Sequence, residues 1–141
     1  MKLDRVFVDT NIILDWLGER KPHFVYARDL FALGENEEIF LLTSTMSFIS
    51  VEYILKKVVG TQRIRQALTA LRTISEVCSS GTKEIDLALN SQFKDFEDAF
   101  QYFSALNNEA DIIITRSPKD FSPSSLPIMS AEEYLKSRLA S

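Results

Sequence analysis

Four carboxylate residues stand where a folded chain could bring them together, although they lie far apart in the sequence. Asp9 follows a short apolar segment, Glu52 lies within a helical pattern, Asp98 lies near the start of another helix, and Asp120 follows a second apolar segment. Two carboxylates about 4 Å apart repel each other by roughly 4 kcal/mol at an effective dielectric near 20. Three or four such groups stay ionised together only if cations neutralise them. Convergence of these residues would therefore make a metal site.

The rest of the composition restricts which metal and which chemistry are feasible. The chain has one histidine, His23, and one cysteine, Cys78. These counts exclude a zinc site built from several Cys and His residues, and they exclude an internal disulfide. Carboxylates alone prefer hard cations such as Mg²⁺ or Mn²⁺. We interpret His23 as a loop residue, Cys78 as a small buried hydrophobe and Trp16 as a packing aromatic.

Length and charge describe a small globular protein. The 141 residues are 45% hydrophobic and 26% charged, which predicts one domain over residues 1–141 with a single core. The net charge of −4 counts against binding of nucleic acid by charge alone, but it says little about a site that meets phosphate through metal ions. The first residues do not read as a signal peptide and no apolar run is long enough to span a membrane, so we expect a cytoplasmic protein.

Short apolar runs alternate with longer helical patterns along the chain. The predicted strands cover residues 5–8, 38–42, 110–114 and 126–129, with one further candidate at 83–87. The predicted helices cover residues 12–17, 24–33, 45–59, 61–77, 95–106 and 131–139. Apolar strands that alternate with amphipathic helices predict an α/β fold, in which helices cover both faces of a parallel sheet. Functional groups in such folds collect beyond the carboxyl ends of the strands.

Asp9 and Glu52 each have a structural and a functional interpretation. Asp9 precedes Thr10 and Asn11, and all three residue types favour a helix N-cap, so Asn11 could cap the helix while Asp9 faces the sheet edge. Glu52 lies at helical spacing from Phe48, on the apolar stripe of its helix. A carboxylate facing a core needs a partner, which is either a metal or a neighbouring basic side chain.

The later carboxylates also carry alternatives. Asp95 is a natural N-cap and Asp98, three residues on, could complete a capping box; the functional interpretation gives Asp98 to a metal. Asp120 is either a loop carboxylate or a fourth ligand. Thr115, which ends the apolar strand before Asp120, could donate a hydrogen bond to Asp9.

Four segments in order resemble the motifs of PIN domains, and they extend over nearly the whole chain. They are Val6-Phe7-Val8-Asp9-Thr10-Asn11, Ser47-Phe48-Ile49-Ser50-Val51-Glu52, Asp95-Phe96-Glu97-Asp98-Ala99 and Ile114-Thr115-Arg116-Ser117-Pro118-Lys119-Asp120-Phe121. In size and layout the chain is similar to the VapC-type toxins of toxin–antitoxin pairs. The resemblance implies a three-layer α/β/α sandwich with a central parallel sheet, and an endoribonuclease that hydrolyses RNA with Mg²⁺ or Mn²⁺.

The resemblance also implies roles for particular residues. By motif position Asp9, Glu52 and Asp98 are the metal ligands and, with Asp120, the catalytic residues. Relatives often carry an acidic residue or Asn two places after the threonine, where this chain has Ser117. This departure leaves open whether Asp120 substitutes and whether one or two metal ions bind.

Supporting roles and partners follow from the same resemblance. Thr10, Asn11, Thr115 and Ser117 would orient the metal ligands, and Arg116 would contact the substrate. The implied partners are an RNA substrate, a cognate antitoxin protein and a second copy of the chain in a homodimer.

Two other functions remain open. Asp9 could be a covalent phosphoryl acceptor, but phosphatases of that kind use a second Asp two residues later, where this chain has Asn11. The chain could instead be a catalytically weak PIN-like protein that binds RNA or regulates a partner.

Overall fold

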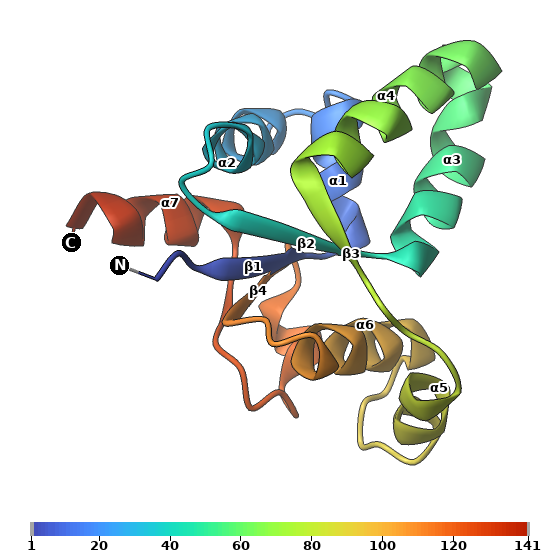
Figure 1. Cartoon of the computed structure of the whole chain (residues 1–141), viewed down its shortest axis with the longest axis vertical. Helices are drawn as coiled ribbons and strands as arrows, with labels where there is room; N and C mark the ends of the chain where they lie inside the picture. The colour runs from blue at the N-terminus through green and yellow to red at the C-terminus, as the bar shows by residue number, and fades with distance from the viewer. Residues whose placement is uncertain (1, 141) are drawn as a thin grey trace.

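The computed structural model describes residues 2–140 and has a five-stranded sheet at its centre (Figure 1). The strand order is β3-β2-β1-β4-β5, and every neighbouring pair is parallel. The strands are β1 (Arg5–Val8), β2 (Phe40–Ser44), β3 (Ser75–Cys78), β4 (Ile112–Ile114) and β5 (Ile128–Met129). Because all five run in the same direction, their carboxyl ends meet along one edge of the sheet.

Helices cover both faces of this sheet, so the fold is the expected three-layer α/β/α sandwich (Figure 1). The helices are α1 (Thr10–Leu17), α2 (Phe24–Glu35), α3 (Thr45–Val59), α4 (Thr61–Ile74), α5 (Thr82–Leu89), α6 (Phe96–Asn107) and α7 (Ala131–Ala140), with a short 3-10 helix η1 (Pro118–Phe121). None of the helices within residues 2–140 is long and apolar enough to cross a membrane.

Alternating side chains of the strands build two cores. Val6 and Val8 of β1 face one side and pack in a cluster with residues of α1, α2, α3, α4 and α7. Phe7 faces the other side, where it packs in a cluster with Tyr102 of α6 and Phe121 of η1. This alternation follows from the two-residue period of a strand, and it explains why the whole of β1 is apolar.

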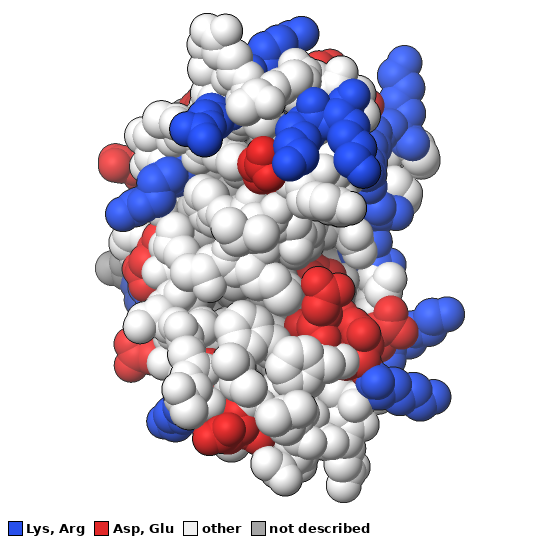
Figure 2. All heavy atoms as spheres, turned by 90° about the vertical axis from the view of Figure 1, so that its right-hand side faces the viewer, with Lys and Arg blue, Asp and Glu red and all other residues white. Residues whose placement is uncertain are grey.

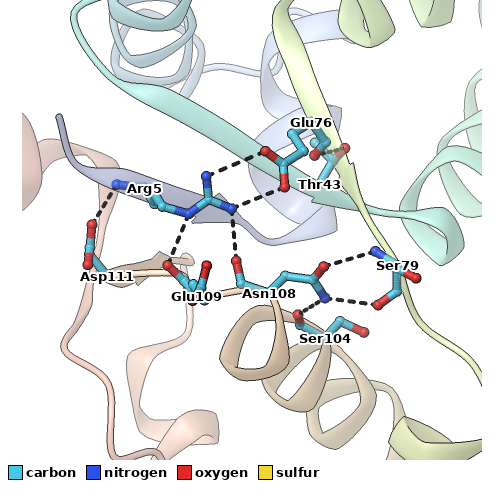
Figure 3. A network of polar contacts seen from close by, with 8 residues as sticks. All are labelled: Arg5, Thr43, Glu76, Ser79, Ser104, Asn108, Glu109 and Asp111. Atoms are coloured by element: carbon cyan, nitrogen blue, oxygen red, sulfur yellow. Dashed lines mark hydrogen bonds and ion pairs between the residues drawn. The ribbon is translucent and has the colours of Figure 1, made fainter. Parts of the chain in front are cut away.

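Arg5 connects the start of β1 to the strands and loops around it (Figure 3). Its guanidinium pairs with Glu76 of β3 at 3.0 Å and donates to the backbone carbonyls of Asn108 and Glu109. Its backbone N–H donates to Asp111 at 2.8 Å. These contacts join β1, β3 and the segment before β4, and so they help to fix the order of the strands.

The sequence-based prediction of one strand and one helix was wrong. Residues 75–77 were expected to continue the helix at 61–77, but they belong to β3, because residues 75–78 pair with the otherwise open edge of β2 from Leu41 to Ser44. Residues 83–87 were a candidate strand but belong to α5. There the Glu84 carboxylate accepts a 2.7 Å hydrogen bond from the Gly81 N–H, which satisfies a free donor at the helix start.

Candidate active site

Asp9 lies at the carboxyl end of β1, the central strand, and its side chain is 7% exposed. It is also the N-cap of α1, the role that the sequence suggested for Asn11. Its Oδ1 accepts hydrogen bonds from the Thr10 N–H at 2.9 Å and from Gln101 Nε2 at 3.4 Å, and its Oδ2 accepts one from Thr115 Oγ1 at 2.9 Å. Burial raises the pKa of Asp9, and these three donors act in the opposite direction.

Gln101 is a residue that sequence reasoning missed. It lies on α6, is 1% exposed, and its Nε2 also donates to Ser47 Oγ at 3.1 Å and Thr10 Oγ1 at 3.3 Å. The Ser47 and Thr10 hydroxyls are 2.7 Å apart, which completes a buried polar network around Asp9. One signal was present in the sequence, since Gln101 follows Asp98 by three residues and so shares its face of the helix.

Asp9 and Asp98 open onto one cleft of about 200 Å³ between α1, α3 and α6. Its other lining residues are Thr10, Asn11, Leu14, Met46, Ser50, Ile54, Glu97 and Gln101. Within residues 2–140 the Oε1 atom of Gln101 has no hydrogen-bond partner, although it is buried. The cleft is therefore lined by three carboxylate residues, Asp9, Asp98 and Glu97, and by neutral side chains that carry oxygen atoms.

Asp98 lies at the start of α6, where Asp95 caps the helix by accepting a 3.3 Å hydrogen bond from the Asp98 N–H. Partial burial raises the pKa of Asp98 to about 7, and the negative charges of Asp9, Asp95, Asp120 and Glu97 add to the rise. The carboxylates that surround Asp98 therefore repel one another at neutral pH. A cation would relieve this repulsion.

Glu52 does not join this cleft, so its expected convergence with Asp9 and Asp98 is not found. Its carboxylate lies 3.8 Å from Lys56 Nζ on the same helix, with 34% of the side chain exposed. The face of α3 that lines the cleft carries Met46, Ser50 and Ile54 instead. Successive helix residues are turned by about 100°, so Glu52 points well away from Ser50.

Asp120 lies on the far side of Asp98 rather than next to Asp9. It is exposed on η1 and lines a second hollow of about 600 Å³ with Asp95, Asp98 and Lys119. In Figure 2 the largest acidic patch has Lys and Arg side chains beside it, and further Lys and Arg side chains lie toward the α3 and α4 end. Asp120 contributes charge to the neighbourhood of Asp98.

Arg116 and Ser117 lie in the short loop between β4 and η1. The Ser117 N–H donates to Thr115 Oγ1 at 3.2 Å, so Ser117 supports the threonine that holds Asp9. The Arg116 side chain turns away from the cleft and pairs with Asp15 of α1 at 2.9 Å.

The donor set suits a hard divalent cation. In the described part of the chain no three carboxylates lie close enough together to hold a metal ion between them. Mg²⁺ is commonly bound by one or two carboxylates, with waters and substrate phosphate completing its octahedral shell. Asp9, Asp98 and the oxygen atoms of Asn11 and Gln101 in the same cleft fit that pattern.

Comparison with known proteins places the chain in a family. Residues 5–118 match the PIN domain family. Ribonuclease VapC1 of Aquifex aeolicus (strain VF5) is 27% identical over 139 residues, which is 95% of each chain.

Three solved structures have the same fold at low sequence identity. VapBC2 from Rickettsia felis, bound to a DNA fragment from their promoter, superposes with a TM-score of 0.66 at 14% identity, over 89% of this chain and 97% of that one. PAE2754 from Pyrobaculum aerophilum superposes with a TM-score of 0.65 at 15% sequence identity, over 97% of this chain and 96% of that one. Mycobacterium tuberculosis VapC20, a Sarcin-Ricin loop cleaving toxin, superposes with a TM-score of 0.62 at 16% sequence identity, over 77% of this chain and 86% of that one. With the family match over residues 5–118, the fold leads to one assignment: this chain belongs to the PIN domain family.

Proposed function

We propose that this chain is a metal-dependent endoribonuclease that hydrolyses RNA phosphodiester bonds and acts as the toxin of a toxin–antitoxin pair. Membership of the PIN domain family and the similarity to ribonuclease VapC1 along almost the full length of both chains support the activity. The structural similarity to a Sarcin-Ricin loop cleaving toxin supports the choice of RNA.

One structural observation carries the proposal. The buried Asp9 carboxylate receives three hydrogen bonds and opens onto the same cleft as Asp98, whose pKa is raised to about 7 by burial and by the charge of Asp9 and other carboxylates. Such an arrangement is unfavourable without a counter-ion. A protein that kept Asp9 only as a helix cap would not need Asp98 beside it.

Asp9 and Asp98 are the residues that would hold Mg²⁺ or Mn²⁺. When bound, such an ion lowers the pKa of a water molecule and neutralises the negative charge of the phosphate. Glu52 is not among the proposed ligands, because it lies outside the cleft. Asp120 is proposed to tune the charge at Asp98 from the neighbouring hollow.

The remaining side chains keep Asp9 oriented and ionised. Thr115 and Gln101 fix one carboxylate oxygen each, and the Thr10 N–H adds a second bond to Oδ1. Hydrogen bonds to a carboxylate favour its charged form, so they oppose the effect of burial. The buried Oε1 of Gln101 has no hydrogen-bond partner within residues 2–140, while its Nε2 holds Asp9.

An antitoxin and a second copy of the chain are the proposed protein partners. The likeness to VapBC2 of Rickettsia felis supports the antitoxin. Exposed apolar side chains on one face of α3 provide a surface that a partner would cover, since Ile49 is 73% exposed and Tyr53, about one turn later, is 59% exposed. Exposed apolar patches of this kind often mark protein interfaces.

One observation favours a second candidate, a catalytically weak PIN domain that binds RNA. Ser50 occupies the α3 face of the cleft, so only Asp9, Asp98 and the helix-start Glu97 supply charge there. A site with fewer carboxylates holds a metal less tightly.

RNA cleavage with and without metal separates the two candidates. The purified chain is incubated with a structured RNA in Mn²⁺, in chelator, and in chelator followed by excess Mn²⁺. The nuclease proposal predicts cleavage in the first and third reactions and none in the second. Binding of the RNA without cleavage in any reaction would favour the second candidate.

A further inference from the structure

A cavity of about 270 Å³ lies beside the cleft and is not used by the chemistry described above. It is enclosed by α1, the start of α2, the loop after β4 and the start of α7. Asp15, His23, Tyr26, Arg116, Ser117 and Ser130 supply its polar and aromatic groups.

Asp15 is the unusual feature of this cavity. The residue is 1% exposed, and its Oδ2 lies 2.9 Å from Arg116 Nε. Within residues 2–140, both carboxylate oxygens of Asp15, Oδ1 and Oδ2, are buried and have no hydrogen-bond partner, so the ion pair with Arg116 is the one direct contact among these residues that compensates them. A buried carboxylate oxygen without a donor is unfavourable by about 1–3 kcal/mol or more, so a buried group in this state calls for a ligand.

The basic side chains around Asp15 compensate its buried charge only in part. Burial raises the pKa of the Asp15 carboxyl, and the nearby Arg116, His23 and Arg20 side chains act in the opposite direction. Of these, Arg116 forms an ion pair with Asp15 through Nε. The guanidinium has two further nitrogen atoms that donate in a fixed plane. The pair therefore presents an acceptor, Asp15 Oδ1, next to donors on Arg116.

This arrangement complements one edge of guanine. The Watson–Crick edge of guanine carries the O6 acceptor beside the N1–H and N2–H donors, and no other RNA base has that pattern. Asp15 would accept from N1–H and N2–H while Arg116 donates to O6. The half-buried rings of Tyr26 and His23 line the same cavity and offer flat surfaces on which a base can stack.

The cavity is coupled to the cleft through two successive residues. Thr115 donates to Asp9, and the next residue, Arg116, pairs with Asp15. Consecutive Cα atoms are about 3.8 Å apart, so the two sites lie back to back across the end of β4. Asp9 caps α1 and Asp15 lies six residues later in the same helix, which is about 9 Å along the helix axis.

We propose that this cavity binds a guanine base of the RNA substrate next to the cleaved phosphodiester, with Asp15 and Arg116 as the residues that select it. The inference rests on the proposed ribonuclease function. A free guanine nucleotide has the same chemistry, so the test includes both sources.

The first measurement is calorimetric titration of the wild-type chain, in chelator, with guanosine, inosine and adenosine monophosphates. Inosine lacks the N2 amino group, and loss of one hydrogen bond to a charged acceptor should weaken binding roughly tenfold. Adenosine should bind more weakly still. Equal binding of the three nucleotides overturns the proposal.

The second measurement uses a short RNA with one guanosine and the same RNA with inosine in its place. Wild type should bind the guanosine RNA more tightly than the inosine RNA, and Asp15→Asn should bind the two RNAs equally. Glu52→Gln, which neutralises a carboxylate outside the cavity, should keep the preference of wild type. A preference seen only with free nucleotides contradicts RNA as the source, and a preference that survives Asp15→Asn contradicts the role of Asp15.

Two features keep the result independent of folding and of catalysis. The nucleotide comparison needs only wild-type protein, so a variant that fails to fold does not decide it. All binding is measured without metal. Failure of the chain to cleave RNA therefore does not count against guanine selectivity, and absence of guanine selectivity does not count against RNA cleavage.

Discussion

The hydroxyl of Thr115 lies 2.9 Å from Oδ2 of Asp9, although 106 residues separate the two in the chain. The contact exists because β1 and β4 are neighbours in the sheet, with Val8 opposite Ile114 at their last pair. Each residue directly follows its strand, so parallel pairing brings the two side chains to the same edge. The carboxylate is thus oriented by the sheet itself.

Replacing Thr115 with valine should test this orientation. Thr115→Val keeps the side-chain shape and removes one donor to Asp9, which should raise the pKa of Asp9 further. We expect the free energy of unfolding to fall by about 1–3 kcal/mol, and Mn²⁺ affinity at neutral pH to fall roughly tenfold. Calorimetric Mn²⁺ titration measures the second effect.

Thr43→Val is the matched control, because Thr43 is a buried threonine on β2 that contacts Ser75 at 3.3 Å, outside the cleft. It should leave Mn²⁺ affinity unchanged. Equal loss of affinity in both variants would show that the effect is general destabilisation.

The raised pKa of Asp98 predicts a pH-dependent penalty on folding without metal. Its pKa is 3.8 in the unfolded chain and about 7 in the fold, so the folded state holds the proton more tightly. Stability of the metal-free protein should therefore fall as pH rises between these two values. Asp98→Asn removes the penalty, and its Tm in chelator should exceed that of wild type at about pH 8 but not at about pH 4.

Thermal unfolding at the two pH values gives this comparison directly, with the exposed Asp86→Asn on α5 as the control. The Tm of Asp86→Asn should equal that of wild type at both pH values. A Tm difference for Asp98→Asn that is the same at both pH values would contradict ionisation of the partly buried, carboxylate-flanked Asp98 as its cause.

Glu52→Gln should have little effect on activity, because Glu52 lies outside the cleft and pairs with Lys56. Loss of an exposed helical pair of this kind reduces stability by about 0.3–0.5 kcal/mol. Initial rates of RNA cleavage should stay within about twofold of wild type, since a change of that size in a surface pair does not reach the site. A loss as large as that of Asp9→Asn would place Glu52 in the site after all.

Asp120→Ala should have an intermediate effect. Asp120 adds to the negative charge that raises the pKa of Asp98, so its removal should lower that pKa. It is exposed and lines the neighbouring hollow rather than the cleft with Asp9, so Mn²⁺ affinity should fall less than in Asp98→Asn. Calorimetry on both variants ranks them, and equal loss would make Asp120 a direct ligand.

The sequence could predict the parts of the site that follow from local pattern. The apolar run of β1 followed by Asp9 marked the end of the first strand, and α3 was predicted at residues 45–59 as found. The Ser44 side chain accepts from the Ser47 N–H at the start of that helix, and Gly60 follows its end with a positive φ of 86°. Both are local signals that a sequence shows directly.

What the sequence could not show depends on the rotation of helices and on pairing between distant segments. Glu52 lies at helical spacing from Phe48 while Ser50 lies on a different face of α3, and only the packed helix decides which face turns to Asp9. Gln101 has no motif of its own, and its role appears once α6 is packed beside α1 and α3. Strand β3 was hidden because its residues continue the helical spacing of α4.

The central claim is that Asp9 holds a divalent metal for RNA cleavage, and its most direct test is the rate of cleavage by Asp9→Asn in Mn²⁺. The substitution keeps the size of the side chain and removes the charge. The account predicts a folded protein by thermal unfolding and circular dichroism, loss of at least about a hundredfold in rate, and no recovery at higher Mn²⁺, as expected when a ligand is removed from such a site. Cleavage by folded Asp9→Asn at the wild-type rate, or cleavage by wild type in chelator, would contradict it.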